Sequence, residues 1–409
     1  MSGKGSPDTS PTGSADTTTG CIEVYLFNIH YPMIPRTENY LFSRNFIVIL
    51  FQLTRAMKSI ASALVALFIL TGICAFRTGE NNKASDGNQN GRSGVAVIMT
   101  GAAARIPQEA ALLEELDNRG LFKDVVFISG VSSGALNSVM LNAVLSGKLS
   151  WEEYRNILFG LKNSDIFTQG QKKIPVNSAP ERELFRRIVE DGLGYETIGD
   201  LPFTTAISFT HLQELGVKKN VYRMCSRKIN PESDTTLSLV DIMMASSAFP
   251  VAFPPVRIKN ARTIPDVEYV DGGVGEDHVP YHALLQFEKF KGKGVDKVYI
   301  ISRKCDSIPE VSEELMNLGI NDRGIFDRLG ISLDEILEKG IIKRLKAYAS
   351  EAPELASRTF VWMPDFKADF LMFDFSNLQE QYEMTSQWAR INEPIPLADF
   401  FLAAEKKAR

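Results

Sequence analysis

The sequence predicts an α/β fold with a mostly parallel central sheet and helices on both of its faces. Two apolar runs, Val95–Met99 and Val125–Ser129, have the composition of buried strands, and a helical pattern follows each of them. Strand, helix, strand and helix within about fifty residues are typical of a right-handed βαβ unit. This unit sets the fold class for the rest of the chain.

The first helix of the unit is predicted between Pro107 and Gly120. Proline is favoured in the first turn of a helix, and glycine commonly ends one. Apolar residues recur at helical spacing between them, at Ala110, Leu113 and Leu116. The preceding turn of small residues, Gly101–Arg105, lies at the carboxyl end of the first strand, which is where parallel sheets bind ligands.

The second strand leads into the motif Gly130-x-Ser132-x-Gly134, and a helical pattern then runs up to Gly147. A strand-to-helix turn of this kind needs small flanking residues and leaves its serine exposed at the tip. The adjacent helix N-terminus favours developing negative charge. We therefore predict that Ser132 is a nucleophile; the alternative is a Gly/Ser-rich turn that only joins two core elements.

Further elements follow along the chain at spacings that suit the same sheet. Asp271 comes directly after a short strand at Tyr269-Val270 and before two glycines, so it is either a site acid or an ordinary Asp-Gly turn. The other predicted elements are strands at Thr205–Phe209, Val221–Cys225 and Val298–Ser302, and helices at Leu237–Ala248 and Leu378–Ala389.

Composition excludes several classes of protein. With 409 residues, of which 44% are hydrophobic and 23% charged, the chain is globular and long enough for one large domain or two. A formal net charge of −5 without a basic block argues against a nucleic-acid partner. The four cysteines lack metal-ligand spacing and no calcium-loop motif occurs, so we expect neither a metal nor a cofactor.

The region before residue 94 falls into three predicted segments. Residues 1–56 begin with a polar stretch that should be disordered and otherwise have no assigned role. Residues 57–76 combine a basic start with a continuous apolar run, as in a secretory signal peptide or membrane anchor, and residues 77–93 form a polar linker. We therefore expect export or membrane anchoring, with Met57 as the natural start of the protein.

Three motifs occur in a fixed order along the chain: GVSSG at 130–134, ASSAFPVAFPP at 245–255 and DGG at 271–273. Together they resemble the patatin-like phospholipase family of bacterial acyl hydrolases. The resemblance implies a three-layer α/β/α fold, with a catalytic core at 94–305 and a mainly helical C-terminal region at 306–409 that packs on the core. It also implies a dyad without histidine, in which Ser132 is the nucleophile and Asp271 takes its proton.

Such a dyad sets two conditions. A carboxylate is an effective general base only when its pKa lies near the operating pH, so Asp271 is expected to be largely enclosed. The family's oxyanion loop corresponds here to Gly101, Ala102, Ala103 and Arg105, with alanine at two positions that are usually glycine. We expect Ala102 and Ala103 to offer backbone N–H donors, which requires a negative φ at an alanine. Arg105 would orient this loop, attract an anionic head group, or simply lie on the surface.

Two sets of alternatives stay open. His278 would complete a triad in the order Ser132, Asp271, His278, but it follows the acid by only seven residues and is therefore interpreted as a rim residue. The predicted function is hydrolysis of lipid or phospholipid acyl esters through an acyl-enzyme, at a membrane surface in the bacterial cell envelope. The alternatives are a lipid-binding protein with little or no hydrolytic activity and a lipid acyltransferase; the sequence makes no prediction of oligomeric state.

Overall fold

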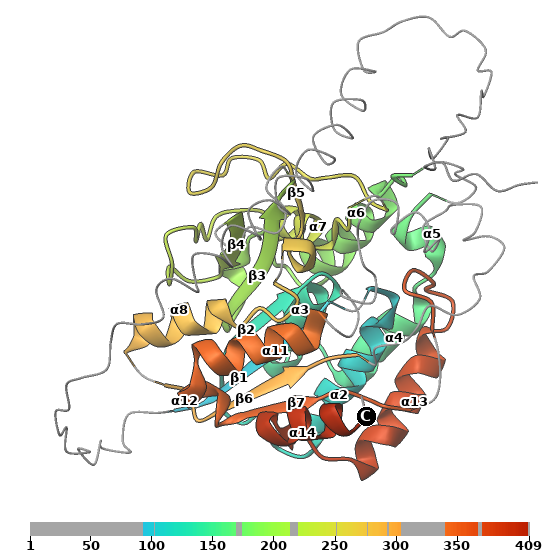
Figure 1. The fold of residues 1–409 in the computed structure, drawn as a ribbon. Helices are drawn as coiled ribbons and strands as arrows, with labels where there is room; N and C mark the ends of the chain where they lie inside the picture. Colours follow the sequence, from blue (N-terminus) through green and yellow to red (C-terminus); the bar gives the residue numbers. More distant parts are fainter. Residues whose placement is uncertain are drawn as a thin grey trace, which may run out of the picture. The chain divides into compact units, whose positions relative to one another are not determined.

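The computed structural model describes residues 93–101, 103–168, 174–212, 220–250, 252–275, 277–292, 294–303, 340–366 and 370–407. These residues belong to one compact unit, Asp86–Arg409 (Figure 1). The predicted segments 1–56 and 57–76, and all of the predicted linker but its last residue, lie outside the described residues. Among the helices that are described, none is long and apolar enough to cross a membrane.

Within the described residues, eight strands form one sheet in the order β4-β3-β2-β1-β6-β7-β8, with β5 paired to β3. The four pairings at its centre, from β3 through β2, β1 and β6 to β7, are parallel, whereas β4, β5 and β8 pair antiparallel. The strands are β1 Val95–Met99, β2 Val125–Val131, β3 Thr204–His211, β4 Val221–Cys225, β5 Tyr269–Asp271, β6 Lys297–Ile301, β7 Thr359–Trp362 and β8 Ile395–Pro396. The predicted mostly parallel sheet is thus confirmed.

The α-helices of the described residues lie between these strands or after them in sequence. They are α2 Ile106–Asn118, α3 Ser133–Leu145, α4 Trp151–Gly160, α5 Asn163–Ile166, α6 Ala179–Phe185, α7 Leu239–Ser247, α8 His282–Lys291, α11 Gly340–Glu351, α12 Pro353–Ala356, α13 Leu378–Ile391 and α14 Leu397–Lys407. Shorter turns of helix are η2 Ala103–Arg105, η3 Arg186–Gly192 (a π-helix), η4 Ile198–Asp200 and η7 Gly272–Gly275. Local sequence sets several ends: Ser150 and Glu153 form a capping box before α4, and Gly292 ends α8 with a positive φ.

The sheet is covered on both faces, which makes three layers. In β1, Ala96 and Ile98 face one side and pack with α8, α11 and α14, while Val97 and Met99 face the other side and pack with α2 and α3. Figure 1 shows α8 and α11 side by side over the first of these faces. A strand covered on both faces needs a continuous apolar run, because neither set of side chains meets water. The predicted α/β/α architecture is therefore confirmed.

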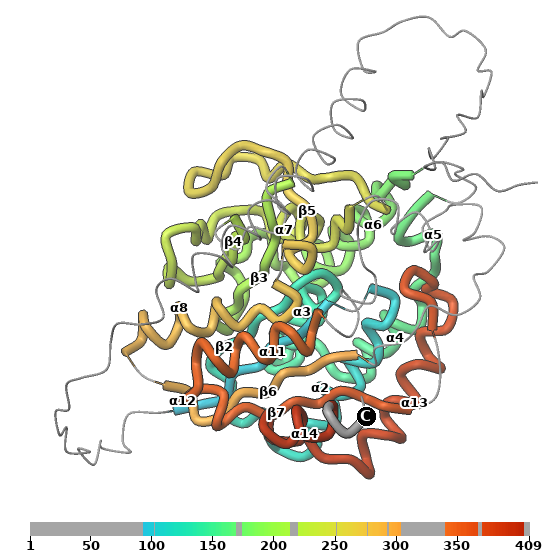
Figure 2. Tube along the Cα trace, in the orientation of Figure 1, coloured from blue at the N-terminus to red at the C-terminus, as the bar shows by residue number. Residues whose placement is uncertain are grey.

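The C-terminal region contributes to the sheet as well as to its cover. Its described residues, 340–366 and 370–407, hold helices α11 to α14 together with β7 and β8, which extend the sheet beyond β6. Helix α13 packs along α2, and Figure 2 shows these two segments, from opposite ends of the described chain, running side by side. This contact brings C-terminal residues to the loop that follows β1.

Candidate active site

The glycines of the G-x-S-x-G turn are required by close backbone approach. A Cβ at Gly130 would lie 2.2 Å from the carbonyl oxygen of Gly134, and a Cβ at Gly134 would lie 2.6 Å from the carbonyl oxygen of Thr100. Neither neighbouring atom can move without shifting the backbone. Ser132 itself has φ 58° and ψ −131°, a conformation that L-residues rarely adopt and that places its side chain at the tip of the turn.

The backbone of Ser132 is fixed by a hydrogen bond from its N–H to the hydroxyl of Ser246 (2.9 Å). That hydroxyl in turn donates to the carbonyl oxygen of Ser208 on β3 (2.7 Å), and Ser246 is fully buried near the end of α7. Helix α3 begins at the residue after Ser132, so its N-terminal dipole points at the turn. The strained turn is therefore held from the sheet side and faces a site suited to negative charge.

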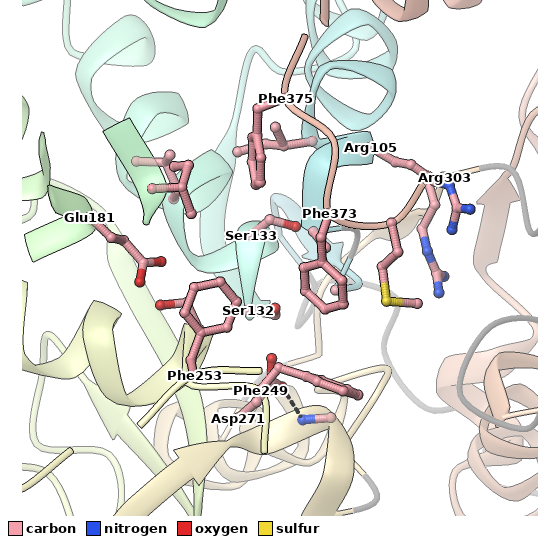
Figure 3. Close-up of a pocket in the computed structure, with 18 of the residues that line it drawn as sticks. Arg105, Ser132, Ser133, Glu181, Phe249, Phe253, Asp271, Arg303, Phe373 and Phe375 are labelled. Atoms are coloured by element: carbon pink, nitrogen blue, oxygen red, sulfur yellow. Dashed lines mark hydrogen bonds between the residues drawn. The ribbon is translucent and has the colours of Figure 1, made fainter. Parts of the chain in front are cut away.

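Asp271 ends β5 and is brought beside Ser132 by the antiparallel pairing of β5 with β3. Its side chain is 3% exposed, lines the same pocket as Ser132, and accepts a hydrogen bond from the Gly273 N–H (2.7 Å; dashed line in Figure 3). Burial raises the pKa of Asp271 to about 6, although the Ser132 side chain and the Gly273 N–H act to lower it. The structure thus brings together the two residues that the sequence singled out, in an enclosed setting.

The loop after β1 approaches the same serine. A Cβ at Gly101 would lie 3.0 Å from Cβ of Ser132, so glycine is needed for this approach. Ala102 lies outside the described residues. Ala103 has φ 47°, so the expected negative φ is wrong at this position, and the left-handed conformation costs roughly 1–2 kcal/mol. Neighbouring contacts hold it there, because the N–H of Ala104 donates to the carbonyl oxygen of Met372 (2.8 Å).

Arg105 is fully buried, so its interpretation as a surface residue is wrong. Its guanidinium donates two hydrogen bonds to the carbonyl oxygen of Phe370, at 3.2 Å and 2.6 Å. The side chain of Gln381 on α13 also donates to the carbonyl oxygen of Ala104 (3.0 Å). These contacts tie the loop to the C-terminal region and give Arg105 an orienting role.

The two histidines near Asp271 occupy different surroundings. His278 lines the same pocket, but burial and the nearby positive charges of Arg303 and Arg344 lower its pKa to about 3. The Asp271 side chain accepts its hydrogen bond from the Gly273 N–H rather than from this imidazole. His282 instead pairs with Glu351 at 3.1 Å. The geometry therefore favours the dyad over the triad.

The rest of the pocket wall is largely apolar. Four aromatic rings stand around Ser132 in Figure 3: Phe249 and Phe253 from the segment after α7, and Phe373 and Phe375 from the segment before α13. Further apolar lining comes from Leu136, Leu161, Ile166, Leu184, Phe185 and Met372. Sequence reasoning missed the lining role of all these residues and of Glu181. The apolar run at 370–375 was a usable signal for the C-terminal part, whereas nothing local marks Glu181.

No group of three or more histidine, cysteine, aspartate or glutamate side chains suited to a metal ion occurs in the described part of the chain. The fold and the pocket define a three-layer α/β/α protein with a serine–aspartate pair beneath an apolar cavity. Residues 97–285 match the family model described as patatin-like phospholipase, so this part of the chain is similar to that family.

Two solved structures resemble the chain over most of its length. The crystal structure of VipD from Legionella pneumophila shares 13% identity, with 78% of this chain and 72% of that chain covered and a TM-score of 0.34. The structure of full-length SpcU in complex with full-length ExoU, from the type III secretion system of Pseudomonas aeruginosa, shares 13% identity over 70% and 68%, with a TM-score of 0.26. At these low scores neither likeness adds to the argument. The comparison with curated proteins gave no match.

Proposed function

We propose that this protein hydrolyses acyl esters of lipids, as a phospholipase A or related lipid acyl hydrolase, through an acyl-enzyme on Ser132. The observation that carries the proposal is the buried carboxyl group of Asp271, which lines the same pocket as Ser132 and whose pKa burial raises to about 6. A serine hydroxyl is a weak nucleophile without a neighbouring base. Asp271 is ionised at neutral pH yet retains a basicity suited to proton transfer.

In the proposed reaction the Ser132 oxygen attacks the ester carbonyl carbon while its proton passes to Asp271. The resulting oxyanion lies against backbone N–H groups of the loop at Gly101–Arg105 and the N-terminus of α3. Asp271 then returns the proton to the leaving alcohol as the carbon–oxygen bond breaks. In the second half, Asp271 takes a proton from a water molecule as the water oxygen attacks the acyl carbon. Asp271 then returns this proton to the Ser132 oxygen as the acyl–serine bond breaks, which releases the fatty acid.

The apolar wall supports a lipid as substrate. Phe249, Phe253 and Phe373 stand beside Ser132 and would cover the first carbons of an acyl chain. Burying apolar surface contributes roughly 0.8 kcal/mol for each methylene group. Acyl-chain binding of this kind explains why a small polar site is surrounded by aromatic rings.

The proposal is tested by labelling the protein with a fluorophosphonate and mapping the modified peptide by mass spectrometry. We expect label on Ser132, at a rate that rises with pH and reaches half its maximum near pH 6, since Asp271 must be ionised to accept the proton. Ser132→Ala is the control and should remain unlabelled. Absence of label on the folded protein would contradict hydrolysis and leave the lipid-binding alternative, whereas acyl transfer to an added alcohol would identify an acyltransferase.

We further propose that residues 57–76 direct the protein to a membrane or out of the cytoplasm, so that it meets lipid at a membrane surface in the cell envelope. The support is the basic start and continuous apolar run of this segment. Fractionation of cells that make the natural protein tests it. Recovery of the protein only from the cytoplasmic fraction would contradict the proposal.

A further inference from the structure

Glu181 is a second carboxyl group in the same pocket. It lies in the first turn of α6, is 5% exposed, and lines the cavity together with Ser132 and Asp271. In Figure 3 its carboxyl group points from the α6 side towards Ser132 and Phe253. The acyl transfer proposed above makes no use of this residue.

One carboxyl oxygen of Glu181 has no protein partner. Its Oε2 atom is buried without a hydrogen-bond partner among the described residues. Leaving a buried polar atom unpaired costs roughly 1–3 kcal/mol. The neighbouring Arg182 does not supply the missing contact, since its guanidinium pairs with Asp241. An atom in this position is suited to a hydrogen bond with a ligand.

Burial alone does not distinguish Glu181 from the other acids of the protein, as a comparison with Glu109 shows. Glu109 is also fully buried, and burial likewise raises its pKa to about 8. However, its two oxygens accept hydrogen bonds from Thr100 (2.9 Å) and Asn137 (3.1 Å), so its hydrogen bonding is complete within the protein. Glu181 differs because its second oxygen is left for the cavity.

The charge state of Glu181 indicates which ligand group it would accept. Burial raises its pKa to about 8, with Asp271 acting in the same direction and with Ser247 and Arg182 opposing it. At neutral pH the group is therefore mostly an uncharged acid, which both donates and accepts a hydrogen bond. A neutral hydroxyl group is complementary to it, whereas an anionic phosphate would meet an apolar wall. Glu181 and Asp271 line the same pocket, so Glu181 lies in the cavity where, in the proposed reaction, Asp271 protonates the leaving alcohol.

We propose that Glu181 binds a free hydroxyl group on the alcohol half of the ester, so that the site prefers monoacyl glycerol lipids over fully acylated ones. This proposal rests on the proposed function, because the alcohol half of the ester lies beside Asp271 only if Asp271 protonates the leaving alcohol. Lysophospholipids and monoacylglycerols share this hydroxyl chemistry. Both are therefore included in the test.

The test measures binding rather than turnover, on the Ser132→Ala protein by calorimetry. The ligands are octanoyl lysophosphatidylcholine and octanoyl glycerol. Each is paired with its deoxy analogue, which lacks the hydroxyl on the glycerol carbon next to the esterified carbon. We expect at least one hydroxylated member to bind about tenfold more tightly or better. Adding Glu181→Leu to the Ser132→Ala protein should abolish this difference in affinity. Adding Glu181→Gln should retain part of it, because an amide still donates and accepts hydrogen bonds.

Glu183→Gln is the matched control, since Glu183 lies on the same helix but is exposed and pairs with Arg186. It should leave the preference unchanged. Glu181→Met, which keeps the length of the side chain, replaces the leucine variant if that one fails to fold. Equal binding of both members in both pairs, or a preference that survives Glu181→Leu, would overturn the assignment.

Turnover is measured separately on the protein that retains Ser132, which keeps the two proposals distinguishable. Discrimination in binding without any hydrolysis would contradict the proposed function and support the role of Glu181. Hydrolysis of both members of each pair at equal rates, with equal binding, would support the proposed function and contradict the role of Glu181.

Discussion

Replacing Asp271 with asparagine is expected to lower kcat/KM for a lipid ester by about a thousandfold or more. An amide has nearly the same shape and size as the carboxyl group, but it does not take up the serine proton. Loss of the correctly protonated partner of a catalytic serine costs on the order of 10³–10⁴ in rate. Hydrolysis of a chromogenic octanoyl ester over pH 5–9 checks this expectation.

The control for this substitution is Asp266→Asn, which changes an exposed aspartate that pairs with the exposed Arg257. It should leave hydrolysis unchanged, because exposed ion pairs contribute little. If Asp271→Asn retained more than about a tenth of the wild-type activity, Asp271 would not be the base. His278→Ala would then identify a histidine-dependent mechanism by abolishing the remainder.

Unfolding does not explain a loss of activity in Asp271→Asn, because the ionised carboxylate opposes folding. The pKa of Asp271 is about 6 in the folded protein and near 3.8 in a model peptide. The folded state therefore binds the proton more tightly, and stability falls as pH rises from about 4 to about 6, by roughly 3 kcal/mol. Asparagine escapes this loss, so chemical denaturation at pH 8 should show the variant to be more stable than the wild type.

The central strands could be predicted because their signal is local. In a strand covered on both faces every residue is apolar, and the run at Val95–Met99 has the same limits in sequence and structure. The edge strand Val221–Cys225 also has its predicted limits, although it contains the buried Arg223. β7 has four residues and β8 two, and both lie in the C-terminal region that was read as mainly helical. Their pairing is set by tertiary contacts with β6, which a short sequence window does not contain.

The residues of the candidate site also differ in whether the local sequence marks them. Ser132, Asp271 and Gly101 lie at strand ends beside glycines, where turn chemistry marks them in the sequence. The conformation of Ala103 could not be predicted, because contacts of its neighbours with the C-terminal region hold it at a positive φ. Glu181 comes from a short helix after a long connection, so only the folded chain shows that it faces the cavity.

Asp277→Asn is expected to produce the largest loss of stability, about 3–5 kcal/mol in the free energy of unfolding at pH 7. Asp277 is buried and accepts hydrogen bonds from the Arg223 guanidinium at 3.0 Å and 3.1 Å and from the Ser208 hydroxyl at 2.7 Å. Arg223 is itself 7% exposed, so neutralising its partner leaves a buried positive charge without compensation. The effect extends to the site, because the carbonyl oxygen of Ser208 holds Ser246 and through it the backbone of Ser132.

Urea denaturation measures this loss, with Asp266→Asn again as the surface control at below about 1 kcal/mol. A double variant, Asp277→Leu with Arg223→Met, removes both charges and should be more stable than Asp277→Asn alone, since no unpaired ion remains. A double variant that is less stable than the single one would show that the charges are not what makes this pair important. The comparison separates loss of the charge pair from loss of packing.

The dependence of stability on pH provides an independent check on the same pair. Burial alone would raise the pKa of Asp277, but the charge and hydrogen bonds of Arg223, together with the nearby His282, outweigh it and hold the pKa well below its usual value of 3.8. The unfolded chain therefore binds the proton more tightly, so the stabilisation is complete above about pH 5 and is lost as pH falls below about 4. Asp277→Asn lacks this contribution at every pH, and the difference in stability between wild type and variant should shrink steadily between pH 4 and pH 2. A difference that stayed constant over this range would mean that Asp277 does not carry its charge in the folded protein.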